Sequence, residues 1–340
     1  MWKFKSILSI IGICILLGSG VVGCRNENTL EMLDTKGNAV EERTIQTQPS
    51  NDERIKVGVS YQNLQNEFIQ NIQEALSAKA KELDIELIEA DGQGKSEYQI
   101  SHVESFIVRK VDVIILNPCS VEGCKLAVQS ANKAGIPILT VNNIVANQDM
   151  CETYVGSDSE ESGRIQMEYV AKKLQGKGNI VILRGPIGHD AEIGRRKGAQ
   201  EILEKYPGIK VLFEQSANWS RDEAKAIMEV WLQSGQHIDA VVAQNDEMAL
   251  GALKAVEEVD KLNDILIFGV DAIPDALDAI NGGRMEATVF QDAKGQGIKA
   301  IEAAFRIAKG LQVEKTIYIP YDLVTRDDVY KYIDLDYSRR

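Results

Sequence analysis

From Arg54 onward, short apolar runs alternate with amphipathic stretches. Apolar residues recur at helical spacing between the runs, as with Phe68, Ile72 and Leu76, and predict helices over 67–83, 98–108 and 126–134. This alternation predicts an α/β fold, with parallel strands covered by helices on both faces. The runs expected as strands are 55–59, 85–89, 113–116, 137–141, 180–183, 211–214, 240–243, 266–270 and 287–290.

The chain also repeats its own pattern. Val111–Asn117 leads through a helical stretch to Ile138–Asn142, and Ile238–Asn245 leads in the same way to Leu266–Asp271. Each half carries polar residues just after its strands, at the sheet edge where open parallel sheets bind ligands. The repeat favours two doubly wound lobes that face each other across a cleft. One large doubly wound sheet is the alternative.

The N-terminal residues have the pattern of an export signal. Lys3 and Lys5 precede the apolar run Ile7–Leu17, and small residues then lead to Cys24. A Cys at the expected cleavage site is typical of bacterial lipoproteins, whose Cys is lipidated. We therefore expect a signal peptide over 1–23, and a lipidated N-terminus with a polar, disordered tether over 24–53. A plain signal peptide or an uncleaved anchor helix is the alternative. The expected location is extracytoplasmic, on the cell membrane.

Charge and cysteine content narrow the possible partners. The chain has 340 residues and a net charge of -13, so a nucleic-acid partner is disfavoured. After removal of the signal and lipidation of Cys24, Cys119, Cys124 and Cys151 remain. An oxidising compartment permits a disulfide, but free thiols are slightly favoured. The C-x4-C pair has no nearby His and is a weak metal signal, so no metal is expected.

Signatures of catalysis are missing from the sequence. It contains no phosphate loop and no G-x-S-x-G turn, and Gly92–Gly94 lacks the third glycine of a dinucleotide site. The only histidines are His102, His189 and His237, and no spacing among them suggests zinc. We therefore expect no enzyme and no cofactor.

Polar and aromatic residues gather instead at the predicted strand-to-helix junctions. Planar amides, carboxylates and guanidinium groups suit the rim hydroxyls of a sugar, and aromatic rings suit its C–H faces. The same residue types also serve purely structural roles: Asn and Asp are common N-caps, Phe68 or Trp219 can be core residues, and Arg195 can form a surface pair with Arg196. The candidate ligand-binding residues are Asn66, Phe68, Asn142, Asn143, His189, Asp190, Arg195, Trp219, Asn245, Asp271 and Gln291.

One stretch gives a specific resemblance. Ala243–Ala252 is similar to type I periplasmic sugar-binding proteins of the ribose and galactose group, as are residues 114–118, 135–138 and 269–271. The resemblance implies two lobes joined by a three-segment hinge, with crossings near 156–158, 291 and 319–320. It also implies a lobe of 54–156 plus 292–318, a lobe of 157–291 plus 319–335, and an ABC transporter permease as partner.

The resemblance assigns roles to the candidates as well. Phe68 and Trp219 resemble the stacking aromatics and Arg195 the ligand-binding arginine, while Asn245, Asp271 and Gln291 resemble the hydrogen-bonding set. Ribose binders have Asp-Arg where this chain has Asn142-Asn143, which argues against a pentose. Residues 166–169, 217–219 and 289–293 resemble inositol-binding members, so myo-inositol or a related cyclitol is favoured and a hexose comes second. The alternative function is a sugar-sensing lipoprotein that docks a chemoreceptor or a histidine kinase.

Overall fold

The computed structural model describes residues 54–333, whose strands form two six-stranded sheets. We call the first sheet and its helices the first lobe. Its strand order is β11-β5-β4-β3-β1-β2, and neighbouring strands are parallel throughout. The strands are β1 (Lys56–Tyr61), β2 (Glu86–Asp91), β3 (Val113–Leu116), β4 (Ile138–Val141), β5 (Tyr154–Gly156) and β11 (Thr316–Tyr318).

The second sheet and its helices form the second lobe. Its strand order, β12-β10-β9-β8-β6-β7, repeats the arrangement of the first sheet strand for strand. One pair differs, because β12 runs antiparallel to β10. The strands are β6 (Lys177–Arg184), β7 (Gly208–Ser216), β8 (Ala240–Ala243), β9 (Leu266–Phe268), β10 (Ala287–Gln291) and β12 (Tyr321–Thr325).

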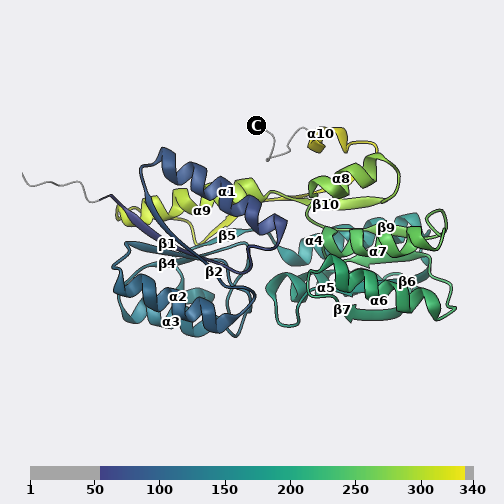
Figure 1. The fold of residues 1–340 in the computed structure, drawn as a ribbon, viewed down its shortest axis with the longest axis horizontal. Coiled ribbons are helices and arrows are strands. Elements are labelled where there is room, and N and C mark those ends of the chain that lie inside the picture. Colours follow the sequence, from purple (N-terminus) through teal and green to yellow (C-terminus); the bar gives the residue numbers. More distant parts are fainter. Residues whose placement is uncertain (1–53, 334–340) are drawn as a thin grey trace, which may run out of the picture. The chain divides into compact units, whose positions relative to one another are not determined.

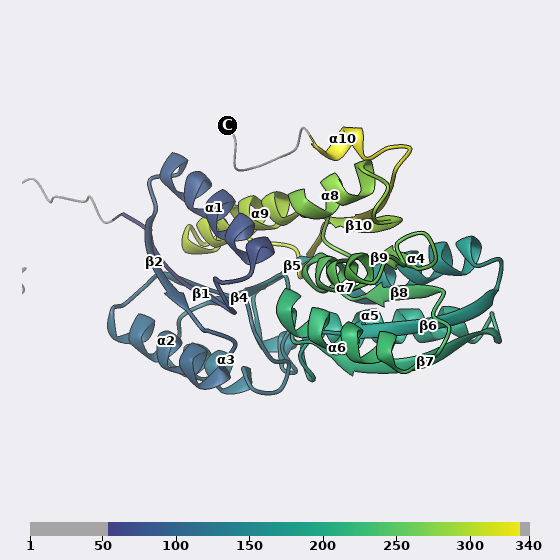
Figure 2. The same cartoon turned by 45° about the vertical axis from the view of Figure 1, so that its right-hand side comes forward.

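Helices cover both faces of each sheet, as Figures 1 and 2 show. In the first lobe, α1 (Glu67–Glu82) and α9 (Ala293–Ala308) lie on one face, and α2 (Ser96–Val108) and α3 (Lys125–Lys133) on the other. In the second lobe, α4 (Ser159–Lys173) and α5 (Asp190–Leu203) face α6 (Arg221–Gln233), α7 (Asp246–Glu258) and α8 (Pro274–Asn281) across the sheet. Two short helices complete the fold, the 3-10 helix Gln148–Met150 and α10 (Tyr330–Ile333).

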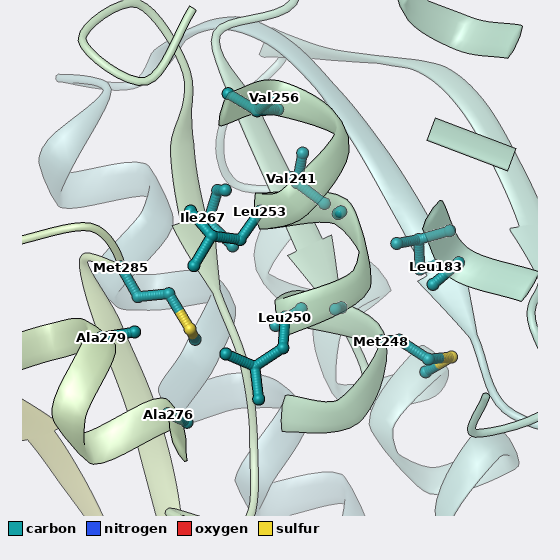
Figure 3. Packing of buried hydrophobic residues seen from close by; sticks show 14 of the residues in the cluster. Leu183, Val241, Met248, Leu250, Leu253, Val256, Ile267, Ala276, Ala279 and Met285 are labelled. Carbon is teal, nitrogen blue, oxygen red and sulfur yellow. The ribbon is translucent and has the colours of Figure 1, made fainter. Parts of the chain in front are cut away.

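The central strands show why apolar runs predicted this fold. Val113 and Ile115 of β3 pack under α1 and α9, whereas Ile114 and Leu116 pack under α2 and α3. Successive side chains of a strand point to opposite faces, so a strand covered on both faces is apolar at every position. Figure 3 shows the corresponding core of the second lobe, where Val241, Leu253 and Ile267 lie together.

The chain passes between the two sheets three times. It leaves the first sheet after β5 and enters α4, returns after β10 into α9, and crosses again between β11 and β12. The residues at these passages are 157–158, 292 and 319–320.

The predicted fold class, two α/β lobes built on parallel sheets, is confirmed. Strands β5, β11 and β12 were not among the expected strands, because they are only three to five residues long and carry no continuous apolar run. Cys24, the signal and the tether lie outside the described residues. Within 54–333, no helix has both the length and the apolar character that crossing a membrane requires.

Candidate ligand-binding site

A small cavity lies between the two lobes. All the predicted site residues except Asn143 and Asp190 line it. The walls also contain Gln62, Ile69 and Ala191, which were not among the candidates from the sequence. The first lobe contributes Gln62, Asn66, Phe68, Ile69 and Asn142, and the second contributes His189, Ala191, Arg195, Trp219, Asn245, Asp271 and Gln291.

Arg195 is the centre of the second-lobe wall. Its buried guanidinium donates from Nη2 to Gln291 Oε1 at 2.9 Å and to Asp271 Oδ1 at 3.5 Å, and from Nη1 to the backbone oxygen of Gln244. Helix α5 can hold Arg195 here because α4 approaches it closely at Gly163. A Cβ on Gly163 would lie 2.2 Å from the Arg195 backbone oxygen.

Asp271 shares this buried environment. Burial raises the pKa of Asp271 to about 8, although the neighbouring Arg195 cation opposes the rise. Its backbone has a φ of 123°, in the region that favours glycine, as do Asn142 at 67° and Trp219 at 62°. Such conformations cost free energy and gather at ligand sites, where the surrounding structure holds them.

Asp246 holds the Asp271 loop in place. It is fully buried, and its carboxylate accepts hydrogen bonds from Thr288 Oγ1 at 2.7 Å and from the Ile273 backbone N–H at 3.1 Å. Burial raises the pKa of Asp246 to about 6. Asp246 was not a candidate from the sequence, because nothing in the run 244–247 distinguishes a side chain that faces the cavity from one that supports the next loop.

Trp219 is half-buried at the rim of the cavity. Its ring lies over Gly185, where a Cβ would be 2.0 Å from the indole. The Arg195 guanidinium carbon is 5.8 Å from the Trp219 ring centroid, and the His189 ring meets it edge to face at 5.3 Å. Phe68 is different, because it is buried and also belongs to the core under α1.

Neutral amides form the first-lobe wall. Asn117 accepts from the Gln62 backbone N–H at 3.1 Å and donates from Nδ2 to the Val141 backbone oxygen at 3.2 Å. Asn142 donates to Gln296 Oε1 at 3.1 Å. Each of these side chains therefore has a fixed orientation before any ligand arrives. Asn117 and Gln296 were not among the candidates from the sequence, and neither lines the cavity.

The segment 188–190 of the second lobe contacts the first lobe directly. His189 Nε2 lies 2.6 Å from Gln62 Oε1 and 3.3 Å from Asn143 Nδ2, and Gly188 O accepts from the Val121 backbone N–H at 3.1 Å. Burial lowers the pKa of His189 to about 3, so the ring is neutral at pH 7. Its Nδ1 accepts from the Ala191 N–H, which leaves Nε2–H as the donor to Gln62.

Asp190 belongs to the same interlobe contact. Its carboxylate accepts from the Ile144 backbone N–H of the first lobe, and burial raises the pKa of Asp190 to about 6. The structure thus places Asp190 and Asn143 where the lobes touch, next to the cavity.

Three candidates cap helices as well as lining the cavity. Asn66 accepts from the Ile69 N–H at the start of α1, His189 from Ala191 at the start of α5, and Asn245 from Met248 at the start of α7. The same side chains therefore both cap a helix and line the cavity. An N-cap at the end of a parallel strand already sits at the sheet edge that faces the cleft.

Two buried polar atoms at the site have no hydrogen-bond partner in the described part of the chain. They are the Arg195 Nε–H and Asn143 Oδ1, one in each lobe. Arg195 lines the cavity and also interacts with the buried Tyr321, whereas Asn143 lies beside the cavity, so the polar lining and not these two atoms defines the binding surface. The arrangement can bind and orient hydroxyl groups.

The matches to known proteins agree with this geometry. A model of the periplasmic binding protein domain matches residues 57–312. The chain belongs to the periplasmic binding protein family. Members of this family act outside the cytoplasm as solute-binding proteins, and the lobes have the type I arrangement that the resemblance implied.

Several relatives span most of the chain. A putative rhizopine-binding protein of Rhizobium meliloti is 35% identical over 81% of this chain and 92% of its own length. A xylitol-binding protein of Mycolicibacterium smegmatis is 37% identical over 82% of this chain and 80% of its own length. An ABC transporter solute-binding protein of Bacillus halodurans, solved with bound myo-inositol, is 44% identical with a TM-score of 0.81, and the match covers 83% of this chain and 98% of that one.

These relatives of the periplasmic binding protein family are binding proteins and not enzymes. The prediction of an ABC transporter solute-binding protein is confirmed at that level. The alternative of a lipoprotein that docks a chemoreceptor or a histidine kinase gains no support from them.

Proposed function

We propose that this protein captures a neutral polyhydroxylated molecule between its lobes and delivers it to an ABC transporter permease. The observation that carries the proposal is the polar cavity between the lobes, where Arg195, Asp271 and Gln291 of the second lobe lie opposite Asn66 and Asn142 of the first. Arg195 already has partners within its own lobe, Gln291 Oε1 and Asp271 Oδ1, so it does not need a charged ligand.

Within this proposal, each lobe has its own part. Arg195, Asp271, Gln291 and Asn245 bond ligand hydroxyls from the second lobe, and Asn66 and Asn142 do so from the first, with Asn143 beside them against His189. Trp219 and Phe68 cover the apolar C–H faces. His189 and Asp190 seal the closed cleft against the first lobe.

The favoured ligand is myo-inositol or a related cyclitol, with a hexose second. Support comes from the Bacillus halodurans protein with bound myo-inositol and from a Caulobacter myo-inositol-binding protein, solved with myo-inositol, at 28% identity and a TM-score of 0.79. myo-Inositol also carries a hydroxyl on every ring carbon, which matches a wall with hydrogen-bonding groups on both sides.

A thermal-shift panel of myo-inositol, D-glucose, D-ribose and xylitol tests the ligand. A ligand that binds only the native state raises Tm, because it stabilises that state by RT ln(1 + [L]/Kd). We expect the largest shift with myo-inositol and the smallest with ribose. The same Tm with every compound would contradict the proposed ligand class, and a dominant shift with glucose would replace the cyclitol by a hexose.

We also propose that binding closes the cleft by hinge rotation. The lobes comprise 54–156 with 292–318 and 157–291 with 319–335, and the hinge lies at the passages between the sheets. Because the site is divided between lobes, the ligand binds the closed form better, which is the condition for a population shift. Small-angle scattering should give a smaller radius of gyration with myo-inositol than without it. Equal radii in both states would indicate a rigid pocket.

Finally, we propose that Cys24 carries the lipid that holds the protein on the membrane. The pattern of residues 1–24 supports this, and the extracytoplasmic family is consistent with it. Cys24→Ala should move the protein from the membrane fraction to the soluble fraction or block its processing, while the control Cys119→Ala stays with the membrane. Unchanged partitioning and processing of Cys24→Ala would contradict lipidation.

A further inference from the structure

Two thiols lie together at the mouth of the cleft. The Sγ atoms of Cys119 and Cys124 are 4.0 Å apart, and both residues are free thiols in the structure. Cys119 is partly exposed and lines a wide opening outside the cavity, together with Gln62 and Trp219. Cys124 is fully buried, directly before α3.

Hydrogen bonds hold both thiols in place. The Cys124 thiol donates to Gln99 Oε1 at 3.2 Å, and Ser96 Oγ lies 3.5 Å from Cys119 Sγ. The hydrogen bond from the Cys119 thiol lowers the pKa of Cys124 to about 6, and the same contact raises the pKa of Cys119. The two thiols therefore ionise as a pair, and the N-terminus of α3 favours the negative charge on Cys124.

We propose that Cys119 and Cys124 form a reversible disulfide in response to small-molecule disulfides outside the cytoplasm, and that this disulfide tunes the closure of the cleft. In the first step, a protein thiolate attacks R–S–S–R and releases one RS⁻, which leaves a mixed disulfide. The second cysteine then attacks the protein sulfur and releases the other thiol. The sum is one protein dithiol and one R–S–S–R giving one protein disulfide and two R–SH.

The loop between the two cysteines takes part in closure. The Val121 N–H donates to Gly188 O of the second lobe at 3.1 Å, and Pro118 O accepts from Asn143 Nδ2 at 3.1 Å. The Cys119 N–H donates to Gln99 Oε1 at 2.9 Å. The residues on either side of Cys119 thus orient Asn143 and meet the second lobe.

A disulfide changes the position of Cys119. The sulfur separation has to shorten from 4.0 Å to about 2 Å, and Cys124 is held in the core beneath α3, so the Cys119 side chain rotates or its backbone moves toward Cys124. We expect this change to disturb the neighbouring contacts of Pro118 with Asn143 and of Val121 with Gly188. Loss of one such hydrogen bond weakens ligand binding by roughly three- to tenfold, and we expect oxidation to have an effect of that size.

Peptide mapping tests the bond without any ligand. Trypsin cuts after Lys110 and Lys125, so Cys119 and Cys124 fall in one peptide and Cys151 in another. The full-length protein in detergent is equilibrated with oxidised and reduced glutathione at several ratios. We expect the peptide 111–125 to lose about 2 Da as the pair oxidises. Cys151→Ala should behave like the wild type, whereas Cys119→Ser should form at most a glutathione adduct. A peptide that remains a dithiol at every ratio would overturn the proposal.

Titration with myo-inositol tests the effect on closure, which rests on the proposed function. Oxidised wild type should bind it roughly three- to tenfold more weakly than reduced wild type, and Cys119→Ser should show no dependence on the redox ratio. Equal affinity in both redox states would overturn the link to closure. If no polyol binds in either state, the proposed function fails, whereas the mass shift still decides whether the disulfide forms.

Discussion

The two lobes share one strand order but present different chemistry to the cavity. The second lobe offers a cation and a carboxylate, Arg195 and Asp271, together with the amide of Gln291. Among the described residues, the first lobe contributes no charged side chain to the cavity wall, only amides and apolar groups. Charge-assisted hydrogen bonds are stronger than neutral ones, so we expect the second lobe to provide the stronger contacts with the ligand.

Under the proposed closure, this division disfavours an empty closed form. Charged groups on both lobes would attract or repel each other even without ligand. With a neutral first lobe, an empty closed cavity leaves Asp271 buried without a hydroxyl partner, and burial raises its pKa to about 8 because it disfavours the charged form. Ligand hydroxyls that donate to Asp271 remove that cost, and this ties closure to the presence of ligand.

Removal of the Arg195 charge from the second lobe should have the largest effect on ligand affinity. Arg195→Met leaves Asp271 buried without its cation, and we expect ligand affinity to fall at least about a hundredfold. The matched control is Arg196→Met, since Arg196 is exposed, pairs with Glu214 and does not line the cavity. Isothermal titration calorimetry with the best ligand of the panel measures both variants. Similar affinities in the two variants would refute the central role of Arg195.

The aromatic rim of the second lobe should rank next. Trp219→Ala is expected to weaken binding by roughly tenfold to thirtyfold, from lost stacking and lost apolar burial, with little change in the Tm of the unliganded protein. Trp231 is the control, because it is buried and stacks on Phe213. Trp231→Ala should cost about 3–5 kcal/mol of stability. Should Trp219→Ala lower stability as much as Trp231→Ala does, Trp219 is a core residue.

The contact between the lobes should respond to pH through His189. Because its pKa is lowered to about 3 when the cleft is closed and is near 6.5 when exposed, closure requires the neutral ring. Acidification below about pH 6.5 protonates the open form only, so this group contributes an affinity that decreases as pH falls. The ratio of the ligand affinity of wild type to that of His189→Gln should therefore fall by roughly thirtyfold between about pH 7.5 and about pH 5.

The aspartates are common to both proteins, so their titration cancels from that ratio. The ratio is obtained from the ligand affinities of wild type and His189→Gln, measured by calorimetry at the two pH values. A ratio that is independent of pH would mean that His189 does not change its protonation on closure.

Replacement of a neutral group in the first lobe should have the smallest effect. Asn143→Ala removes an uncharged hydrogen-bonding group, so we expect a loss of about fivefold in affinity. Asn132→Ala, an exposed asparagine of α3 in the same lobe, is the control and should bind normally. A loss for Asn143→Ala as large as that for Arg195→Met would erase the difference between the lobes.

Much of this architecture could be predicted from the pattern of the chain, for a physical reason. Strands buried on both faces are continuous apolar runs, and the strand-to-helix junctions then lie at one edge of the sheet. That rule selected Asn245, Asp271 and Gln291, which the structure brings together around Arg195. Strands β5, β11 and β12 were not predicted because none of them is a continuous apolar run.

What could not be predicted depends on how the lobes meet. Gln62 follows β1 just as the chosen residues follow their strands, but nothing local shows that His189 of the other lobe lies 2.6 Å away. Asp190 directly follows His189 in sequence, yet its carboxylate meets the Ile144 N–H of the first lobe and does not line the cavity. Likewise, the approach of Cys119 to Cys124 is a matter of side-chain geometry that spacing leaves open.

The interleaved course of the chain has a consequence for the order of folding. Helix α1 packs against α9. Ile72 and Leu76 therefore cannot be buried until their partners Ala300 and Ile301 have been synthesised, more than two hundred residues later. The first lobe therefore cannot complete its hydrophobic core on a nascent chain until nearly the whole polypeptide has been synthesised. Contacts so distant in sequence also slow folding, because a long loop must close before they form. For a member of an extracytoplasmic family, such a delay keeps the chain in a translocation-competent state.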